Sequence, residues 1–199
     1  YQGGHNAGHS VYVGERAFVL RLLPSGIIHE GKTCVLGNGM VIDPKAFFEE
    51  IDQMREQGIS ITPERLKVSS RAHLIMPYHR ALDHTSEERL GNEKIGTTLR
   101  GIGPAYEDKA GRRGIRVSDA LVPDLLKLRI ERNLEEANRI IVLYGREPLR
   151  SDEIFEEISE LVERLRPFVS ETSHFLSEAR KQNKKILLEG AQATLLDVD

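Results

Sequence analysis

The chain has 199 residues, of which 39% are hydrophobic and 30% are charged, a balance typical of a globular domain that buries a core. This composition excludes a disordered tail, a collagen and a disulfide-rich miniprotein. The net charge is only −3 and no apolar run approaches the roughly 20 residues that span a bilayer, so neither nucleic acid nor a membrane is an expected partner.

The first half of the chain alternates strand-like and helix-like segments. Short apolar runs bounded by turn-forming residues predict strands over residues 17–23, 33–36, 40–42, 65–69 and 73–76. Asp43 and Pro44 are favoured at a helix start, and apolar residues recur at helical spacing from there to Gly58. Pro77 begins a further predicted helix that reaches Leu90.

The only cysteine, Cys34, lies in the second of these predicted strands. A single cysteine cannot form a disulfide within the chain, and this fits a reducing compartment. No stretch of the sequence resembles a signal peptide. We therefore expect a cytoplasmic protein.

Glycine is concentrated in two regions of the sequence. Eight of the 17 glycines lie between Gly3 and Gly39 and six lie between Gly91 and Gly114, which leaves three for the rest of the chain. The second region has too many glycines for a regular element. We therefore expect a long loop there, of the kind that is usually functional or mobile.

The second half of the chain is predicted to be mainly helical. Apolar residues at spacings of three and four predict helices over residues 126–144 and 154–165, and a third helix over 170–182 leads to a buried strand over 185–190. The fold class is therefore α/β, a largely parallel central sheet with flanking helices and a helical subdomain over about 123–182. Binding loops of such sheets follow the carboxyl ends of strands, where residue 190 would lie.

The segment from Gly3 to Ser10 combines glycines with two histidines, an amide and a hydroxyl. Glycines let backbone N–H groups approach an oxyanion closely, and histidine can donate or accept a proton near neutral pH. This combination favours phosphate or substrate binding. Two alternatives stay open here, a solvated loop and a metal site in which His5 and His9, four residues apart, bind one ion from a helix.

A basic stretch in the middle of the chain points to an anionic ligand. Residues 96–104 place hydroxyls beside glycines, and residues 109–116 add four cations and no carboxylate. From Lys94 to Arg116 six cations face two carboxylates, so this stretch carries +4 and the rest of the chain −7. Arginine binds phosphate in a bidentate manner, which favours a phosphate ligand. The alternatives are a solvated basic loop and a non-catalytic anion- or nucleic-acid-binding module that uses residues 109–116, although Tyr106 is the only aromatic residue available for stacking.

Motifs along the whole chain resemble the adenylosuccinate synthetase family. In order, they are YQGGHNAGH, LLPSGI, GNG, PYHRALD, IGTT, RGIGPAYEDK, RRGIRV and EGAQ followed by TLLDVD. The resemblance implies a P-loop-NTPase-like α/β fold and a GTP-dependent ligase that joins inosine monophosphate (IMP) to L-aspartate in purine nucleotide biosynthesis. It also implies Mg²⁺ as a cofactor and a cytoplasmic homodimer.

The resemblance assigns the phosphoryl-transfer chemistry to the amino-terminal loop. In the family, the 6-oxygen of IMP attacks the γ-phosphate of GTP, and the amine of aspartate then displaces that phosphate from the 6-phosphoryl intermediate. His9 matches the catalytic histidine, which acts as a proton donor at the transferred phosphoryl group. The carbonyl of Gly8 matches a Mg²⁺ ligand, and Gly8, His9 and Ser10 match the residues that line the GTP phosphates.

The resemblance likewise predicts the IMP site. Thr98 matches a residue that binds the 5′-phosphate, and Gln192 matches one near the purine 6-position. Arg112 matches an arginine that reaches into the partner subunit's site, which makes dimerisation part of catalysis. The full set of expected IMP-binding residues is Asn6, Ala7, Gly8, His9, Thr98, Arg112 and Gln192.

Three positions depart from the family pattern: Ser10 stands where Thr is expected, and Leu99 and Ala193 stand where Gly is expected. None of these departures removes a named ligand. The family's loop with the general-base aspartate and most GTP contacts would precede Tyr1, and its guanine- and aspartate-binding residues would follow Asp199. We therefore expect residues 1–199 to be a single, incomplete catalytic domain that is inactive in isolation.

Overall fold

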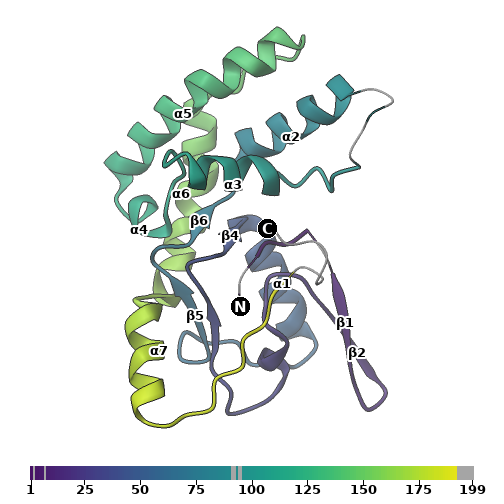
Figure 1. Ribbon diagram of the computed structural model, residues 1–199, viewed down its shortest axis with the longest axis vertical. Coiled ribbons are helices and arrows are strands. Elements are labelled where there is room, and N and C mark those ends of the chain that lie inside the picture. Colours follow the sequence, from purple (N-terminus) through teal and green to yellow (C-terminus); the bar gives the residue numbers. More distant parts are fainter. Residues whose placement is uncertain (2, 7, 91–92, 94–95, 192–199) are drawn as a thin grey trace. The chain divides into compact units, whose positions relative to one another are not determined.

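The computed structural model describes residues 1, 3–6, 8–90, 93 and 96–191. The chain divides into two compact units, one formed by Tyr1–Ala72 with Leu165–Asp199 and the other by His73–Arg164. In Figure 1 the first unit carries the purple, blue and yellow parts of the chain, and the second carries the teal and green parts. Each unit contains both strands and helices.

A three-stranded parallel sheet lies in the first unit, in the order β3, β5, β7. Its strands are β3 (Cys34–Leu36), β5 (Leu66–Ser69) and β7 (Val169–Ser170). In the register of the sheet, Cys34 lies opposite Leu66 and Val68 lies opposite Val169. The parallel pairing of strands that are far apart in the sequence confirms the predicted α/β class.

Helix α1 (Pro44–Glu56) begins and ends where the sequence predicted. Asp43 caps it, because its Oδ1 atom accepts hydrogen bonds from the N–H groups of Lys45 (3.0 Å) and Ala46 (3.2 Å). After the helix the chain turns at Gly58, whose φ of +81° lies in the left-handed region that favours glycine. The buried face of α1 has one charged residue among five apolar ones, and consists of Pro44, Phe47, Phe48, Glu50, Ile51 and Met54.

An antiparallel hairpin follows the glycine-rich start of the chain and extends from the first unit in Figure 1. It consists of β1 (His9–Val13) and β2 (Arg16–Leu20), and its register places His9 opposite Leu20. The strand predicted over 17–23 is therefore confirmed only as far as Leu20. Strand β1 was not predicted, because its polar first residues continue the pattern of the preceding loop.

The remaining elements of the first unit are short apart from one helix. They are η1 (Ser25–Ile28), β4 (Val41–Ile42), η3 (Arg166–Phe168) and α7 (Thr172–Lys181). The rings of Phe47 and Phe168 pack edge to face in the core of this unit, with centroids 5.9 Å apart.

Helices dominate the second unit. Its elements are β6 (His73–Leu74), α2 (Pro77–Leu90), α3 (Ile102–Ala110), α4 (Val117–Ala120), α5 (Pro123–Leu143) and α6 (Ser151–Leu165), whose last residue belongs to the first unit. Helix α2 packs against α3 and α5, and α4 packs against α5. Among the described residues, no helix is both long enough and apolar enough to cross a membrane.

Two predictions of secondary structure are wrong. The glycine-rich region from Gly91 to Gly114 contains helix α3, because Gly101 and Gly111 occupy the two ends of the helix. Residues 185–190 do not form a buried strand, and Leu187 and Leu188 are 84% and 86% exposed. A short apolar run cannot be assigned from its pattern alone, because its partners decide whether it pairs.

Candidate functional site

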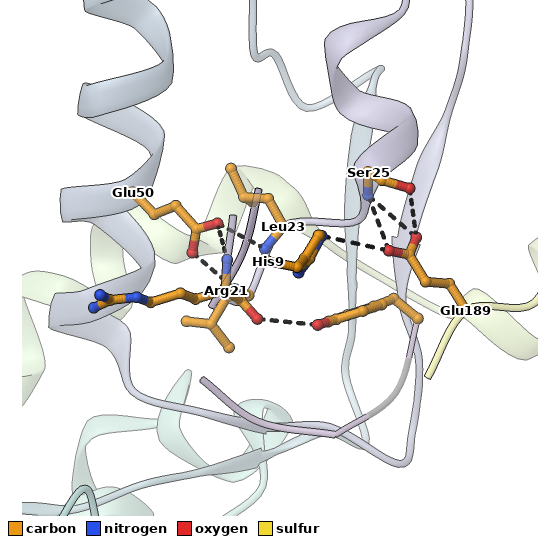
Figure 2. A network of polar contacts seen from close by, with 8 residues as sticks. His9, Arg21, Leu23, Ser25, Glu50 and Glu189 are labelled. Atoms are coloured by element: carbon orange, nitrogen blue, oxygen red, sulfur yellow. Dashed lines mark hydrogen bonds and ion pairs between the residues drawn. The ribbon is translucent and has the colours of Figure 1, made fainter. Parts of the chain in front are cut away.

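His9 lies beside an acidic side chain at the start of β1. Its Nε2 atom is 3.7 Å from Oε1 of Glu189, and Figure 2 shows the imidazole and the carboxylate pointing toward one another. This nitrogen is buried and makes no hydrogen bond among the described residues, whereas the side chain as a whole is 37% exposed. A partly exposed imidazole beside a carboxylate can exchange a proton with a ligand.

Glu189 is itself fixed by the loop that follows β2. Its carboxylate accepts hydrogen bonds from the backbone N–H of Ser25 (3.1 Å to Oε2 and 3.3 Å to Oε1) and from the Ser25 hydroxyl (3.1 Å). These contacts join residues that lie 164 positions apart in the sequence. The position of Glu189 beside His9 is therefore set by a distant segment, and local patterns in the sequence gave no signal for it.

Glu50 of α1 holds the turn that follows β2, as Figure 2 shows. Its carboxylate is buried and accepts hydrogen bonds from the backbone N–H groups of Arg21 (2.7 Å), Leu22 (2.8 Å) and Leu23 (3.2 Å). These N–H groups are used for Glu50, which explains why β2 ends at Leu20. Because Leu20 is the partner of His9 in the hairpin, Glu50 fixes the backbone on which His9 is placed.

Burial raises the pKa of Glu50 above its ordinary value, and the three backbone hydrogen bonds offset part of this effect by stabilising the charged form. The sequence did contain a signal for this residue. Glu50 lies three positions after Phe47, inside the apolar stripe of a helix, where a charged residue needs a buried partner. A carboxylate at such a position predicts that its side chain accepts hydrogen bonds from a neighbouring segment of the buried core.

The structure gives no support to a metal site built on a helix in the amino-terminal loop. Among the described residues of the segment from 3 to 10 there is no helix, since His9 begins β1. His5 is buried and its Nε2 atom lies 4.0 Å from Oδ2 of Asp43. In the described part of the chain, no three His, Cys, Asp or Glu side chains come together as metal ligands.

Thr98 lies in the second unit, in the exposed loop that precedes α3. The next residue, Leu99, has a φ of +56°, a conformation that costs a non-glycine residue about 1–2 kcal/mol. This backbone conformation gives a physical reason why glycine would be favoured at this position. The departure at Leu99 therefore changes the strain in the loop and leaves its hydroxyl-bearing residues in place.

Arg112 occupies a position at the end of α3 that usually holds glycine. The N–H of Arg112 donates to the carbonyl of Lys109 (3.2 Å) and the N–H of Arg113 donates to that of Asp108 (2.8 Å), the two hydrogen bonds of a Schellman motif. The left-handed residue of this motif is Arg112 itself, with a φ of +60°. Its side chain is exposed, so packing does not compensate for the strain.

Three other described helices end in a left-handed residue, and each uses a residue type that tolerates it. These residues are Gly58 after α1, Gly145 after α5 and Asn183 after α7. Strained residues that persist at one position are often functional. The arginine at the end of α3 is therefore a candidate ligand-binding residue on structural grounds, beyond its match to the family motif.

The turn that contains Arg112 is fixed by a buried His–Asp pair. Nδ1 of His79 accepts a hydrogen bond from the N–H of Met76 (2.9 Å), so Nε2 carries the proton and donates to Oδ2 of Asp108 (3.1 Å). Asp108 also accepts from Nε of Arg113 (3.1 Å). Burial tends to raise the pKa of Asp108, but the contacts with His79 and Arg113 outweigh it and hold this pKa below its ordinary value.

His79 was not assigned a role from the sequence, where it flanks an apolar strand and the start of a helix. The structure places it at 0% exposure, in contact with the segment that carries Arg112. No signal in the sequence pointed to this contact, because the buried face of α2 also carries Asp83, Thr85 and Glu87 and a polar residue there does not stand out.

The basic segment 109–116 has two of its four cations engaged. The guanidinium of Arg113 pairs with Asp108, and the ammonium of Lys109 lies 5.6 Å from the centre of the Tyr106 ring. Burial and the nearby charge of Arg116 lower the pKa of Lys109. The segment is therefore a structured turn on which Arg112, Arg113 and Arg116 are exposed.

The predicted site residues fall into two groups. Asn6, Gly8, His9 and Ser10 belong to the first unit, and all except His9 are exposed. Thr98 and Arg112 belong to the second unit, where they precede and follow α3. Ala7 and Gln192 lie outside the described residues.

Comparison with known proteins identifies a consistent set of relatives. The model of the adenylosuccinate synthetase family matches residues 1–199. Adenylosuccinate synthetase from Clostridium novyi (strain NT) is 52% identical over 199 residues, and that from Nitratidesulfovibrio vulgaris (strain DP4) is 48% identical over 201 residues; each match covers 100% of this chain and 47% of the relative. This chain thus spans about half the length of the curated relatives.

A solved structure shows the same fold. The fully ligated adenylosuccinate synthetase from Plasmodium falciparum is 33% identical and superposes with a TM-score of 0.86, over 100% of this chain and 46% of that one. The similarity covers every element described above. It supports the α/β assignment independently of the sequence motifs.

The strain at Arg112 predicts a measurable gain in stability on substitution by glycine. We expect Arg112→Gly to be more stable than Arg112→Ala by about 1 kcal/mol, because alanine keeps the left-handed strain that glycine removes. Urea unfolding of the two variants measures this difference. Equal stabilities, or a more stable alanine variant, would show that the backbone at this position is not strained.

Proposed function

The chain belongs to the adenylosuccinate synthetase family, and from this we propose that the protein containing it is a ligase that joins IMP to L-aspartate. GTP is the energy donor, and the products are adenylosuccinate, GDP and phosphate. The single observation that carries the proposal on the structural side is the imidazole of His9, which is 37% exposed and lies beside the carboxylate of Glu189.

We assign His9 the role of proton donor in phosphoryl transfer. A general base takes the N1 proton of IMP, the 6-oxygen attacks the γ-phosphorus of GTP, and the bond from this phosphorus to the β–γ bridging oxygen breaks. The amine of aspartate later displaces the phosphate from carbon 6 and loses its extra proton. Charge develops on the phosphoryl oxygens during the first step, and a fixed donor stabilises it. Glu189, at 3.7 Å, gives the imidazole an electrostatic partner and a preferred orientation.

The amino-terminal loop is suited to GTP phosphates and Mg²⁺. An added Cβ atom on Gly8 would lie 3.4 Å from Nε of Arg21, so a guanidinium lies close to this loop. The carbonyl oxygen of Gly8 fits Mg²⁺, because this ion prefers oxygen ligands and takes several of them from substrate phosphates and water. When bound, Mg²⁺ would neutralise phosphate charge. Ser10 keeps the hydroxyl that the family has at this position.

The proposed IMP contacts divide between Thr98 for the 5′-phosphate and Asn6, Ala7, Gly8, His9 and Gln192 for the rest of the nucleotide. Thr98 is exposed in the loop that precedes α3, where its hydroxyl can donate to a phosphate oxygen. The assignments of Ala7 and Gln192 rest on their match to family motifs. We also propose a cytoplasmic location.

We propose a homodimer in which Arg112 acts on the partner subunit's site. Helix α3 separates Arg112 from Thr98, and its nine residues are about 14 Å long. An exposed guanidinium at the far end of the helix from the phosphate-binding loop supports a role in a different copy of the site. Such a role would explain why an arginine is kept at this position although its backbone conformation lowers the stability of the fold.

Substitution of His9 tests the catalytic assignment. In the complete protein, meaning this chain together with its flanking sequence in the gene, we expect His9→Asn to lower kcat by about 10²- to 10⁴-fold. Binding of IMP and GTP should change little, because asparagine keeps a polar side chain of moderate size. Adenylosuccinate formation and nucleotide titration measure the two effects, and a kcat within about threefold of the parent would refute the role.

Mixing two inactive variants tests the shared site. We expect His9→Asn and Arg112→Ala to be inactive separately, and a mixture of the two to regain about a quarter of the parental activity. Random exchange of subunits makes half of the dimers mixed, and each mixed dimer has one site with both residues intact. A mixture that stays inactive after subunit exchange would contradict the action of Arg112 across the interface.

A further inference from the structure

Three ionisable side chains are buried at intervals of four residues along α2. His79 is fully buried, and Asp83 and Glu87 are each 6% exposed. Spacing by four residues places them on one face of the helix. Burying carboxylates costs free energy unless hydrogen bonds satisfy them, so their partners indicate what the helix face does.

Asp83 uses both of its oxygen atoms to hold the loop that precedes α3. Oδ1 accepts a hydrogen bond from the Thr97 hydroxyl (2.8 Å), and Oδ2 accepts one from the backbone N–H of Gly101 (2.9 Å). Thr98 lies between these two attachment points and is exposed. Asp83 therefore holds the loop at Thr97 and Gly101, and Thr98 between them is exposed.

The loop has a backbone conformation that an unrestrained chain would seldom keep. Gly96, Leu99 and Gly101 have φ angles of +79°, +56° and +74°. Glu87 contributes a further attachment, because its Oε2 atom accepts from the N–H of Gly96 (3.0 Å). Residues 96–101 are thus held by carboxylates of α2 at three points.

Gly101 also lies directly against the backbone of α2. A Cβ atom at this position would come within 2.8 Å of the backbone nitrogen of Arg80 and the carbonyl carbon of His79. This close approach leaves the hydrogen bond from Gly101 to Asp83 inside the interface between loop and helix, where water cannot replace it. A hydrogen bond to a charged acceptor is stronger than one between neutral groups, so the loss of this one should loosen the loop measurably.

We propose that Asp83 is a positioning residue, which holds the loop from Thr97 to Gly101 in the conformation that binds the 5′-phosphate of IMP. This inference rests on the proposed function. Asp83 acts through the loop and does not touch the nucleotide. Without it, part of the binding free energy of IMP would be spent on ordering the loop, so the KM for IMP would rise while the KM for GTP would not.

The test compares Asp83→Leu with the parent in the complete protein. Leucine fills the buried space and accepts no hydrogen bond. We expect a KM for IMP raised about tenfold or more, with kcat and the KM for GTP within about twofold of the parent. Amide hydrogen exchange at residues 96–101, measured without ligands, should become faster by a similar factor.

Two further variants serve as controls. Asp83→Asn should behave almost like the parent, because its oxygen can accept from Gly101 and its amide can donate to the Thr97 hydroxyl. Glu88→Leu replaces another carboxylate of α2, which is 59% exposed and paired with Arg146 of a different segment. This change should alter neither the KM for IMP nor the loop exchange. If Asp83→Leu yields no folded protein, Thr97→Val removes one of the two hydrogen bonds and should raise the KM for IMP.

The outcomes separate this proposal from the proposed function. Unchanged exchange at residues 96–101 in Asp83→Leu would overturn the positioning role. An unchanged KM for IMP with only a lower kcat would also overturn it, because a damaged fold lowers the fraction of active protein without changing the KM. A parent protein that forms no adenylosuccinate would contradict the proposed function. In that case the exchange measurement still decides whether Asp83 holds the loop.

Discussion

The hydrogen bonds that the buried carboxylates of Glu50 and Asp83 accept from backbone N–H groups hold the chain segments next to His9 and Thr98. Irregular, glycine-rich backbone cannot satisfy its own N–H groups as a helix or sheet does, and burial without partners would be costly. Glu50 accepts from Arg21, Leu22 and Leu23 near His9, and Asp83 accepts from Gly101 next to the loop with Thr98. In both units the carboxylate belongs to a helix, and the candidate functional residue lies next to the segment that the carboxylate holds. A charged acceptor forms stronger hydrogen bonds than a neutral one, so few contacts suffice.

The amount that could be predicted from the sequence follows from this arrangement. Helix α1 was predicted correctly because its cap and its apolar spacing are local signals. The assignments of Glu50, Glu189 and His79 were not made, because their partners lie between 27 and 164 residues away or, for His79, on another helix. The number of glycines between Gly91 and Gly114 led to a predicted loop where helix α3 lies, because glycines occur at the ends of helices as well as in loops. The motifs located the candidate residues, whereas only the structure could show what holds them.

Arg112 combines a strained backbone with a side chain for which we propose a function. The end of α3 has the hydrogen bonds of a common helix terminus, yet its left-handed residue is an arginine, where Gly58, Gly145 and Asn183 end other described helices. The strain costs about 1–2 kcal/mol, a large share of the net stability of a typical domain. Its neighbour Arg113 is bound to Asp108, and Nδ2 of Asn133 donates to the carbonyl of Arg113 (2.9 Å), so the turn is held from several sides. A turn held in this way, with the exposed guanidinium of Arg112 on it, suits the recognition of an anionic group.

The central claim is that the protein transfers the γ-phosphoryl group of GTP to the 6-oxygen of IMP. Positional isotope exchange in GTP tests this step directly, with oxygen-labelled GTP, Mg²⁺ and IMP and without aspartate. Reversible transfer frees the β-phosphate of GDP to rotate, so the label should move from the β–γ bridge to non-bridging positions. The exchange should require IMP and be lost in His9→Asn. Absence of IMP-dependent exchange, in complete protein that binds both nucleotides, would contradict the mechanism.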